Sequence, residues 1–131
     1  MDSKNQNGSA FSHTEMRIYD TYIEFNLSTA SELHYPELIT MWAVDEGKSI
    51  YIQPCTAHSQ LVKSAFQFYD RKANPAPQQI RIDYERFVQG LRNDRGWGKD
   101  GLCWVVCGTY LPELDMLQFN LLDAVIDQTS L

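Results

Sequence analysis

The segment Ile39-Thr-Met-Trp-Ala-Val-Asp-Glu-Gly-Lys-Ser-Ile-Tyr-Ile-Gln53 consists of two mostly apolar runs separated by a polar turn signal. Gly47 can adopt the left-handed backbone conformation that a tight hairpin needs, and Asp45 suits the first position of a turn. We therefore predict a β-hairpin that pairs residues 39–45 with residues 48–53. A short helix from Pro36 to Glu46, closed by Gly47, is the alternative.

The chain that follows the hairpin favours helices. Pro54 ends the second strand, and Thr56 can cap a helix over residues 57–71. After a proline-rich break, apolar residues recur at helical spacing and predict a helix over about residues 78–93. The apolar positions of this second helix are Ile80, Tyr84, Phe87, Val88 and Leu91.

The C-terminal third begins with a loop. Residues 94–101 contain three glycines, and the apolar run Leu102–Cys107 predicts a buried strand. Pro112 suits the first turn of a helix that we expect to extend to about residue 128.

The region before the hairpin is ambiguous. Residues 13–27 place their apolar side chains on one side of a helical wheel, and Ser12 with Glu15 fits a capping box, so we favour a helix. The same stretch also alternates between apolar and polar residues in its second half, and a strand is the alternative. Residues 1–12 are polar and are expected to form a disordered tail.

These elements predict an α+β fold with a single domain over residues 13–131. It would hold about three strands, from the hairpin and one buried strand, packed with about four helices. A mostly helical bundle is the alternative. The length of 131 residues is sufficient for one hydrophobic core.

Composition narrows the function classes. The longest apolar run has six residues, too short to span a membrane, and the net charge of −6 disfavours proteins that coat nucleic acid. Three cysteines without a secretory signal indicate reduced thiols and a cytoplasmic location.

Basic residues concentrate in residues 71–99, which carry seven of the eleven lysines and arginines. Trp97 lies among them on a glycine loop, so we expect Trp97, Arg92, Arg95 and Lys99 to contact a partner. We also expect the fold to tolerate the loss of the Trp97 side chain. The alternatives are a solvated helix face with local ion pairs, and an indole folded back over the edge of the core.

The predicted C-terminal helix is acidic, with no positive charge to balance its carboxylates. Such a helix could dock on another protein or form a homodimer, and simple burial in the domain is the alternative. Its candidate contact residues are Glu113, Asp115, Asp123 and Asp127.

No catalytic or metal-binding signature is strong. Cys55, His58, Cys103 and Cys107 could supply four zinc ligands, but in a strand the Cα atoms of Cys103 and Cys107 would lie about 13 Å apart. Cys55 with His58 could form a nucleophile pair, although no third residue stands out to orient them. We therefore expect no metal, no cofactor and no catalytic residue.

We expect a small, acidic, cytoplasmic protein that binds another protein without catalysis, as inhibitors, immunity proteins and chaperones do. The alternative is a small enzyme or a nucleic-acid-associated regulator that uses residues 71–99 or the Cys55/His58 region.

Overall fold

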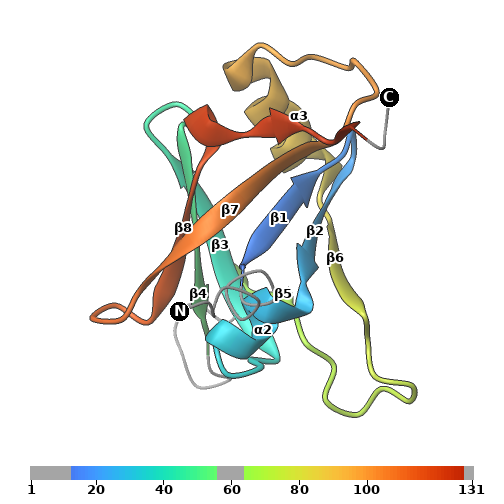
Figure 1. Cartoon of the computed structure of the whole chain (residues 1–131), viewed down its shortest axis with the longest axis vertical. Helices are drawn as coiled ribbons and strands as arrows, with labels where there is room; N and C mark the ends of the chain where they lie inside the picture. The colour runs from blue at the N-terminus through green and yellow to red at the C-terminus, as the bar shows by residue number, and fades with distance from the viewer. Residues whose placement is uncertain (1–12, 56–63, 129–131) are drawn as a thin grey trace, which may run out of the picture.

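Every strand pairing in the computed structural model is antiparallel, and the strands join into one strongly curled sheet (Figure 1). The structure describes residues 13–55 and 64–128, and within them nine strands form a nearly closed barrel in the order β5-β3-β4-β8-β7-β1-β2-β6, with β9 paired to β7. The strands are β1 (Glu15–Ile18), β2 (Tyr22–Asn26), β3 (Leu38–Val44), β4 (Ser49–Pro54), β5 (Phe66–Gln67), β6 (Gln79–Asp83), β7 (Trp104–Leu111), β8 (Met116–Asn120) and β9 (Val125–Ile126).

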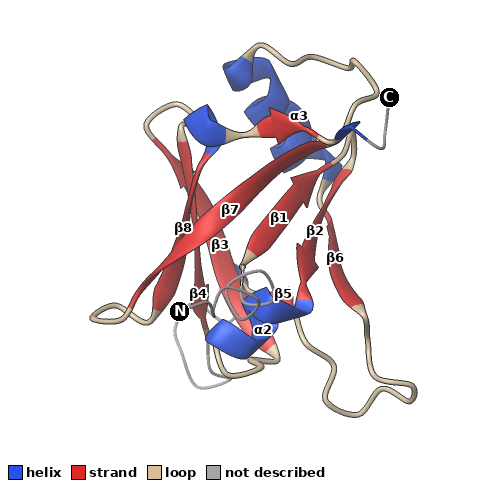
Figure 2. Ribbon diagram, viewed as in Figure 1, coloured by secondary structure: helices blue, strands red, loops and turns tan. Residues whose placement is uncertain are grey.

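Helices are few in the part of the chain that is described. The six-residue α2 (Leu27–Glu32) follows β2, and α3 (Glu85–Arg95) follows β6. Figure 2 shows these two helices at opposite ends of the barrel. A short 3-10 helix, η2 (Leu121–Asp123), joins β8 to β9.

Side chains alternate across the barrel wall. On β1, Met16 and Ile18 are fully buried, whereas Glu15 and Arg17 face outward. The inward residues of β4 and β8 form the other side of the core, where Ile50 pairs with Phe119 and Ile52 with Leu117. This alternation buries one face of each strand and leaves the other face to polar groups, as expected for an antiparallel barrel.

The hairpin prediction is confirmed. β3 pairs with β4 from Ile39↔Pro54 to Val44↔Ser49, and the turn places Asp45, Glu46 and Gly47 at positive φ. Gly47 has φ +77°, and a Cβ there would lie 3.1 Å from the Cβ of Asp94 on α3. The absence of a Cβ at Gly47 therefore permits the positive φ of the turn and lets the turn pack closely against α3.

The α+β fold and the helical bundle are both wrong, because most of the predicted helices are strands. Residues 13–27 form the β1–β2 hairpin, in which the backbone N–H of Tyr19 donates to the carbonyl of Tyr22. Inward residues fall on even positions in β1 and on odd positions in β2. Two strand alternations that are out of phase across a short turn imitate the spacing of a helical stripe.

The two predicted middle helices are also corrected. Of residues 57–71, residues 57–63 lie outside the described residues, and Phe66–Gln67 form β5. Of residues 78–93, the first part is β6, and the helix begins only at Glu85. Ile80 and Ile82 alternate inward on β6, so the stripe read from Ile80 to Leu91 crosses from a strand into a helix.

No C-terminal helix forms where one was expected over residues 112–128. That stretch holds a turn, β8, η2 and β9. Leu117, Phe119 and Leu121 are buried by strand alternation and by the start of η2. The strand predicted over 102–107 is present as β7, although it begins at Trp104 and extends to Leu111.

Among the described residues, no helix is long and apolar enough to cross a lipid bilayer.

Candidate functional site

Beyond Ile39, one edge of β3 has no pairing strand among the described residues. The Cys55 N–H donates to the Leu38 carbonyl (2.9 Å), so even-numbered residues of β3 direct their backbone groups toward β4. On the other side, β5 pairs only with Leu38 and Ile39. The N–H and C=O groups of Met41 and Ala43 therefore point along an edge where no described residue pairs with them.

A groove runs beside this open edge. We call it the β3 groove, and it is lined by Met41, Trp42, Ala43, Ser64, Ala65, Phe66, Tyr84 and Phe87. Its far wall is aromatic, because the rings of Phe66 and Tyr84 lie 5.5 Å apart and those of Tyr84 and Phe87 lie 5.6 Å apart. Tyr84 is 43% exposed, an unusually open position for a large ring. The groove thus combines apolar walls with backbone groups that pair with no strand in residues 13–55 and 64–128.

Helix α3 and the residue before it supply one wall of this groove. Tyr84 is the residue before the helix, and its carbonyl accepts the N–H of Val88 to begin the first turn. At the other end, an Nη of Arg95 donates to the Glu46 carbonyl in the β3–β4 turn (3.2 Å). The C-terminal end of α3 is therefore fastened to the hairpin turn, while its N-terminal end carries the aromatic wall.

The outer face of β3 adds a second aromatic surface. Trp42 pairs with Tyr51 of β4, and their rings stack with centroids 5.7 Å apart and 19° between planes. Both side chains are half-buried, and Gln118 of β8 continues the row beside Tyr51. An added strand at the β3 edge would extend this row.

Arg92 lies in the interior instead of on a basic face. It is 1% exposed, and its guanidinium joins α3 to the loop before β7 and to the β1–β2 turn. Its charge is met by Asp100 at 2.5 Å and Asp20 at 3.5 Å. It also donates to the carbonyls of Ile18, Tyr19, Gly98 and Leu102. Arg92 thus holds the helix on the barrel and has no exposed surface for a partner.

The other predicted basic-face residues are dispersed. Trp97 is half-buried against the core and stacks on Trp104, with centroids 4.4 Å apart and 3° between planes. The indole therefore folds back over the core, and our expectation that the fold tolerates its loss has no support in this geometry. Arg95 is occupied at the hairpin turn, and Lys99 is exposed. Their contact with a partner stays a prediction.

The predicted acidic residues do not share a helix face. Glu113 and Asp115 lie in the exposed turn between β7 and β8, where Asp115 accepts the Tyr110 hydroxyl (2.8 Å). Asp123 is exposed on η2. Asp127 lies beyond β9 and forms an ion pair with Arg17 of β1. The structure therefore brings none of these four into one acidic helix face, and a homodimer through such a helix has no structural basis.

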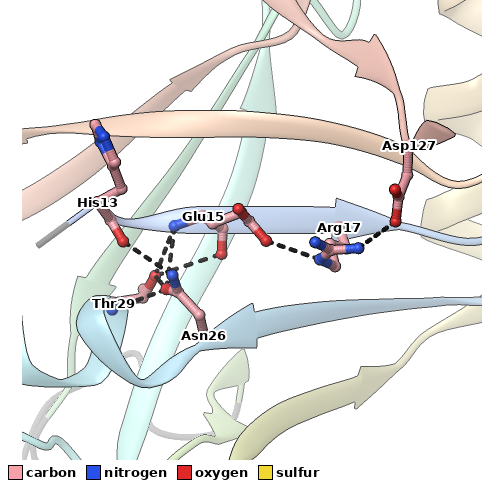
Figure 3. A network of polar contacts seen from close by, with 6 residues as sticks. All are labelled: His13, Glu15, Arg17, Asn26, Thr29 and Asp127. Carbon is pink, nitrogen blue, oxygen red and sulfur yellow. Dashed lines mark hydrogen bonds and ion pairs between the residues drawn. The ribbon is translucent and has the colours of Figure 1, made fainter. Parts of the chain in front are cut away.

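A polar network on β1 fastens the C-terminal strand to the barrel (Figure 3). Arg17 bridges Glu15 (2.7 Å) and Asp127. Burial alone would lower the pKa of Arg17, but the two carboxylates raise it on balance. The network therefore keeps Arg17 charged and acts as a structural clamp.

The same network continues into the start of α2. Asn26 caps this helix through the Thr29 N–H (3.1 Å) and donates to the His13 carbonyl (2.8 Å). The Glu15 N–H donates to the same Asn26 oxygen (3.1 Å). These contacts involve the His13 backbone and give its imidazole no catalytic partner.

The candidate thiol chemistry is not assembled by the described residues. Cys103 is buried and Cys107, four positions further along the chain, is exposed, and His58 lies outside the described residues. Burial raises the pKa of the Cys103 thiol, and burial with the neighbouring Cys103 raises the pKa of Tyr19 to about 12. Within residues 13–55 and 64–128, no three histidine, cysteine or acidic side chains converge as metal ligands. The absence of a bound metal stays a prediction.

Sequence reasoning assigned no role to the groove residues. It placed Tyr84 and Phe87 on a buried helical stripe, and it treated Trp42 only as part of a strand. The signal that could have found them is the density of aromatic residues at 66, 84 and 87 beside a hairpin edge.

Comparison of the chain with protein-family models, with curated proteins and with solved structures found no match.

Proposed function

We propose that this protein is a non-catalytic interaction module that binds an extended segment of another protein in the β3 groove. The observation that carries the proposal is the β3 edge at Met41 and Ala43, which no strand of the described residues pairs, beside an apolar wall. Strand addition uses both features, because the backbone edge supplies hydrogen bonds and the neighbouring pockets hold alternate side chains.

The number of backbone donors and acceptors at the β3 edge limits the affinity for a partner strand. Met41 and Ala43 together offer two N–H donors and two carbonyl acceptors, which fit a partner strand of about four residues. Each net hydrogen bond contributes about 1 kcal/mol, and the aromatic wall adds apolar burial. These contributions support a reversible complex of moderate affinity, as is common for peptide recognition.

The aromatic residues support a protein ligand over a small molecule. Interfaces are enriched in tryptophan, tyrosine and phenylalanine, and the groove is lined by Trp42, Phe66, Tyr84 and Phe87. The proposal keeps the expectation of an inhibitor, immunity or chaperone type of protein and places the main contact at the β3 groove.

Selection of peptides from a random display library on the immobilised protein tests this function. We expect enriched peptides with alternating apolar residues. The variant Ala43→Pro should weaken their binding at least about tenfold, because proline removes the edge N–H without removing a bond to β4.

Ala43→Ser is the matched control, since it changes the side chain at the same position and keeps the N–H. We expect it to bind within about twofold of the wild type. Tyr84→Ala, which leaves the backbone edge intact, should also weaken binding, and thermal unfolding of each variant establishes that it is folded. Failure to enrich any peptide, or equal binding by Ala43→Pro and Ala43→Ser, contradicts the proposal.

A further inference from the structure

We propose that the outward face of β3, β4, β8 and the adjoining half of β7 binds a neutral, extended oligosaccharide. This site is separate from the strand addition proposed above, and neither depends on the other. Its centre is one row of four side chains, which we call the outer row: Trp42, Tyr51, Gln118 and Thr109. The chemistry of the row, the charge around it and its size support the proposal.

The register of the sheet places the four side chains of the outer row next to one another. Trp42 pairs with Tyr51, Tyr51 with Gln118, and Gln118 with Thr109. One straight row therefore crosses four neighbouring strands, which lie on the same side of the barrel (Figure 1). On β4 the two neighbours of Tyr51 along the chain are fully buried, so the row faces outward.

Aromatic rings occupy one end of the outer row, and hydrogen-bonding groups occupy the other. The rings of Trp42 and Tyr51 are nearly parallel, with 19° between their planes, and both side chains are half-buried. The side chains of Gln118 and Thr109 are hydrogen-bonded to no other described residue. A sugar ring has an apolar C–H face and a rim of hydroxyl groups. The row offers an aromatic surface for the first, and an amide and a hydroxyl for the second.

The strands that carry the outer row have an uncharged outward face, although 21% of the residues in the chain are charged. No acidic or basic side chain points outward from β3 beyond Met41, from β4, from β8 or from the last three residues of β7. The outward faces of β1, β2 and β6, in contrast, carry Glu15, Arg17, Glu24, Arg81 and Asp83. Charge is therefore segregated to the other side of the barrel.

The turns at the two ends of this uncharged face are acidic. The β3–β4 turn holds Asp45 and Glu46 with one lysine, Lys48, and the β7–β8 turn holds Glu113 and Asp115. A ligand with phosphate or carboxylate groups would be repelled by both turns, as it would by the net charge of −6. Single-stranded nucleic acid also stacks on aromatic side chains, but it requires a basic surface. The charge layout therefore favours a neutral ligand.

The size of the uncharged face is small for a protein partner. Neighbouring strands lie about 4.8 Å apart, and successive residues on one face of a strand lie about 6.7 Å apart, so the four strands offer roughly 200–300 Å². A stable protein–protein interface buries about 800 Å² on each partner. A folded partner or a second copy would have to extend onto the acidic turns. A short chain of sugar rings lies within the row, and an extended chain follows its straight line across the strands.

Titration of the full chain with cellohexaose, a neutral and extended oligosaccharide, tests the site. The readout is the set of indole N–H signals in the NMR spectrum, which come from Trp42, Trp97 and Trp104. We expect only the Trp42 signal to shift, because Trp97 and Trp104 stack on each other against the core. The affinity should not change between about 50 and 500 mM salt, since a neutral ligand forms no ion pairs.

Variants of the outer row separate this site from the β3 groove. Tyr51→Ala and Gln118→Ala should each weaken cellohexaose binding at least about fivefold, through loss of a ring contact or of hydrogen bonds. Neither residue lines the β3 groove, so both variants should bind a groove peptide as the wild type does. Tyr51→Phe keeps the ring and should bind cellohexaose within about threefold of the wild type.

Tyr22→Ala is the matched control, because Tyr22 is an outward aromatic residue on the charged side of the barrel, beneath Arg81. We expect it to bind cellohexaose within about twofold of the wild type. Thermal unfolding establishes that each variant is folded. If Tyr51→Ala does not fold, Gln118→Ala and Tyr51→Phe still test the row.

Several results would overturn the proposal. One is the failure of cellohexaose and of an array of neutral glycans to bind, and another is salt-sensitive binding of carboxymethylated glycans alone. An equal loss of binding in Tyr22→Ala and Gln118→Ala would place the sugar elsewhere. A shift of the Trp42 signal with protein concentration, without sugar, would show that a second copy covers the row. Each of these results leaves peptide selection at the β3 groove unaffected, so the two proposals fail independently.

Discussion

The indole of Trp97 lies parallel to that of Trp104, with 4.4 Å between ring centroids and 3° between ring planes. Trp104 begins β7, and Trp97 lies in the glycine-rich loop that follows α3. The Trp104 indole N–H also donates to Asp100 (3.3 Å), so the pair and the loop are fastened together. Trp97 is thus a structural residue that covers the core near Arg92.

We expect Trp97→Ala to lower the free energy of unfolding by about 2 kcal/mol, because it removes a half-buried ring and its stacking on Trp104. A double-mutant cycle with Trp104→Ala, measured by urea unfolding, should give a coupling of about 1 kcal/mol. Strictly additive losses would show that the stacked geometry contributes nothing beyond burial of each ring.

The buried Arg92 predicts a large loss on its removal. Arg92→Met should lower the free energy of unfolding by about 3 kcal/mol, since it leaves Asp100 and several backbone carbonyls without their donor. Arg86→Met on the exposed face of the same helix is the control, with an expected change below about 0.5 kcal/mol. Similar losses in both variants would contradict the role of Arg92.

The Arg92–Asp100 pair also predicts a pH dependence. Burial alone would raise the pKa of Asp100, but the Leu102 N–H, the Trp104 indole and Arg92 lower it on balance. A carboxylate whose folded pKa is lowered stabilises the fold above its unfolded pKa of about 4, and this stability is lost as pH falls through the lower folded pKa. Asp100→Asn should therefore be less stable than the wild type at neutral pH, and the gap should narrow below about pH 4. Urea denaturation at a series of pH values measures this difference in the free energy of unfolding. A difference that stays constant from neutral pH to below about pH 4 would exclude a contribution from Asp100 ionisation.

We expect alanine to change the stability of the fold in opposite directions at Gly108 and Gly90. A Cβ at Gly108 of β7 would lie 2.7 Å from a ring carbon of Phe119 and 2.8 Å from the Thr14 hydroxyl. Gly108→Ala should therefore destabilise the fold by about 1–3 kcal/mol. Gly90 of α3 has no neighbour within 4 Å of an added Cβ, so Gly90→Ala should stabilise the helix by about 0.5–1 kcal/mol. Thermal unfolding of both variants decides this, and a shift in the same direction for both would contradict the prediction.

The thiols should differ in reactivity. Cys107 is exposed on β7, whereas Cys103 is buried and its pKa is raised by that burial. Because the thiolate is the reactive form, a thiol reagent at neutral pH should modify Cys107 first and Cys103 only after unfolding. Mass mapping of the native protein gives the order, and Cys107→Ser should remove the early modification. Early labelling of Cys103 would show that its segment opens readily.

Strands were predicted correctly where the turn beside them contains a residue typical of turns, and they were missed where it does not. The β3–β4 hairpin was predictable because Gly47 and Asp45 mark a turn between two long runs. The β1–β2 hairpin was missed because its turn contains no glycine or proline, so the phase change between Ile18 and Ile23 resembled helical periodicity. The boundary between β6 and α3 was missed for a related reason, since Ile80 happens to continue the helical stripe of Tyr84 and Phe87.

The candidate site was less predictable than the fold. The concentration of arginines suggested a basic binding surface, yet Arg92 is enclosed by carbonyls from two separate segments, the β1–β2 turn and the loop before β7. No local sequence pattern specifies that Arg92 is buried, because its burial depends on contacts with residues far away in the sequence. The β3 groove likewise arises only where the short β5 stops pairing after Ile39.

The position of the β7–β8 hairpin in the barrel has a consequence during synthesis. β8 pairs with β4, and β7 pairs with β1, so this late hairpin joins two earlier strand groups between which the described residues form no other ladder. Until the ribosome releases residues 104–120, Ile50 lacks its neighbour Phe119 on β8 and Met16 lacks its neighbour Val106 on β7. A nascent chain stalled before Trp104 therefore displays two separate three-stranded groups, β5-β3-β4 and β1-β2-β6, each with an uncovered apolar face that holdase chaperones recognise. Completion of the barrel is a single closing event that depends on the last quarter of the protein.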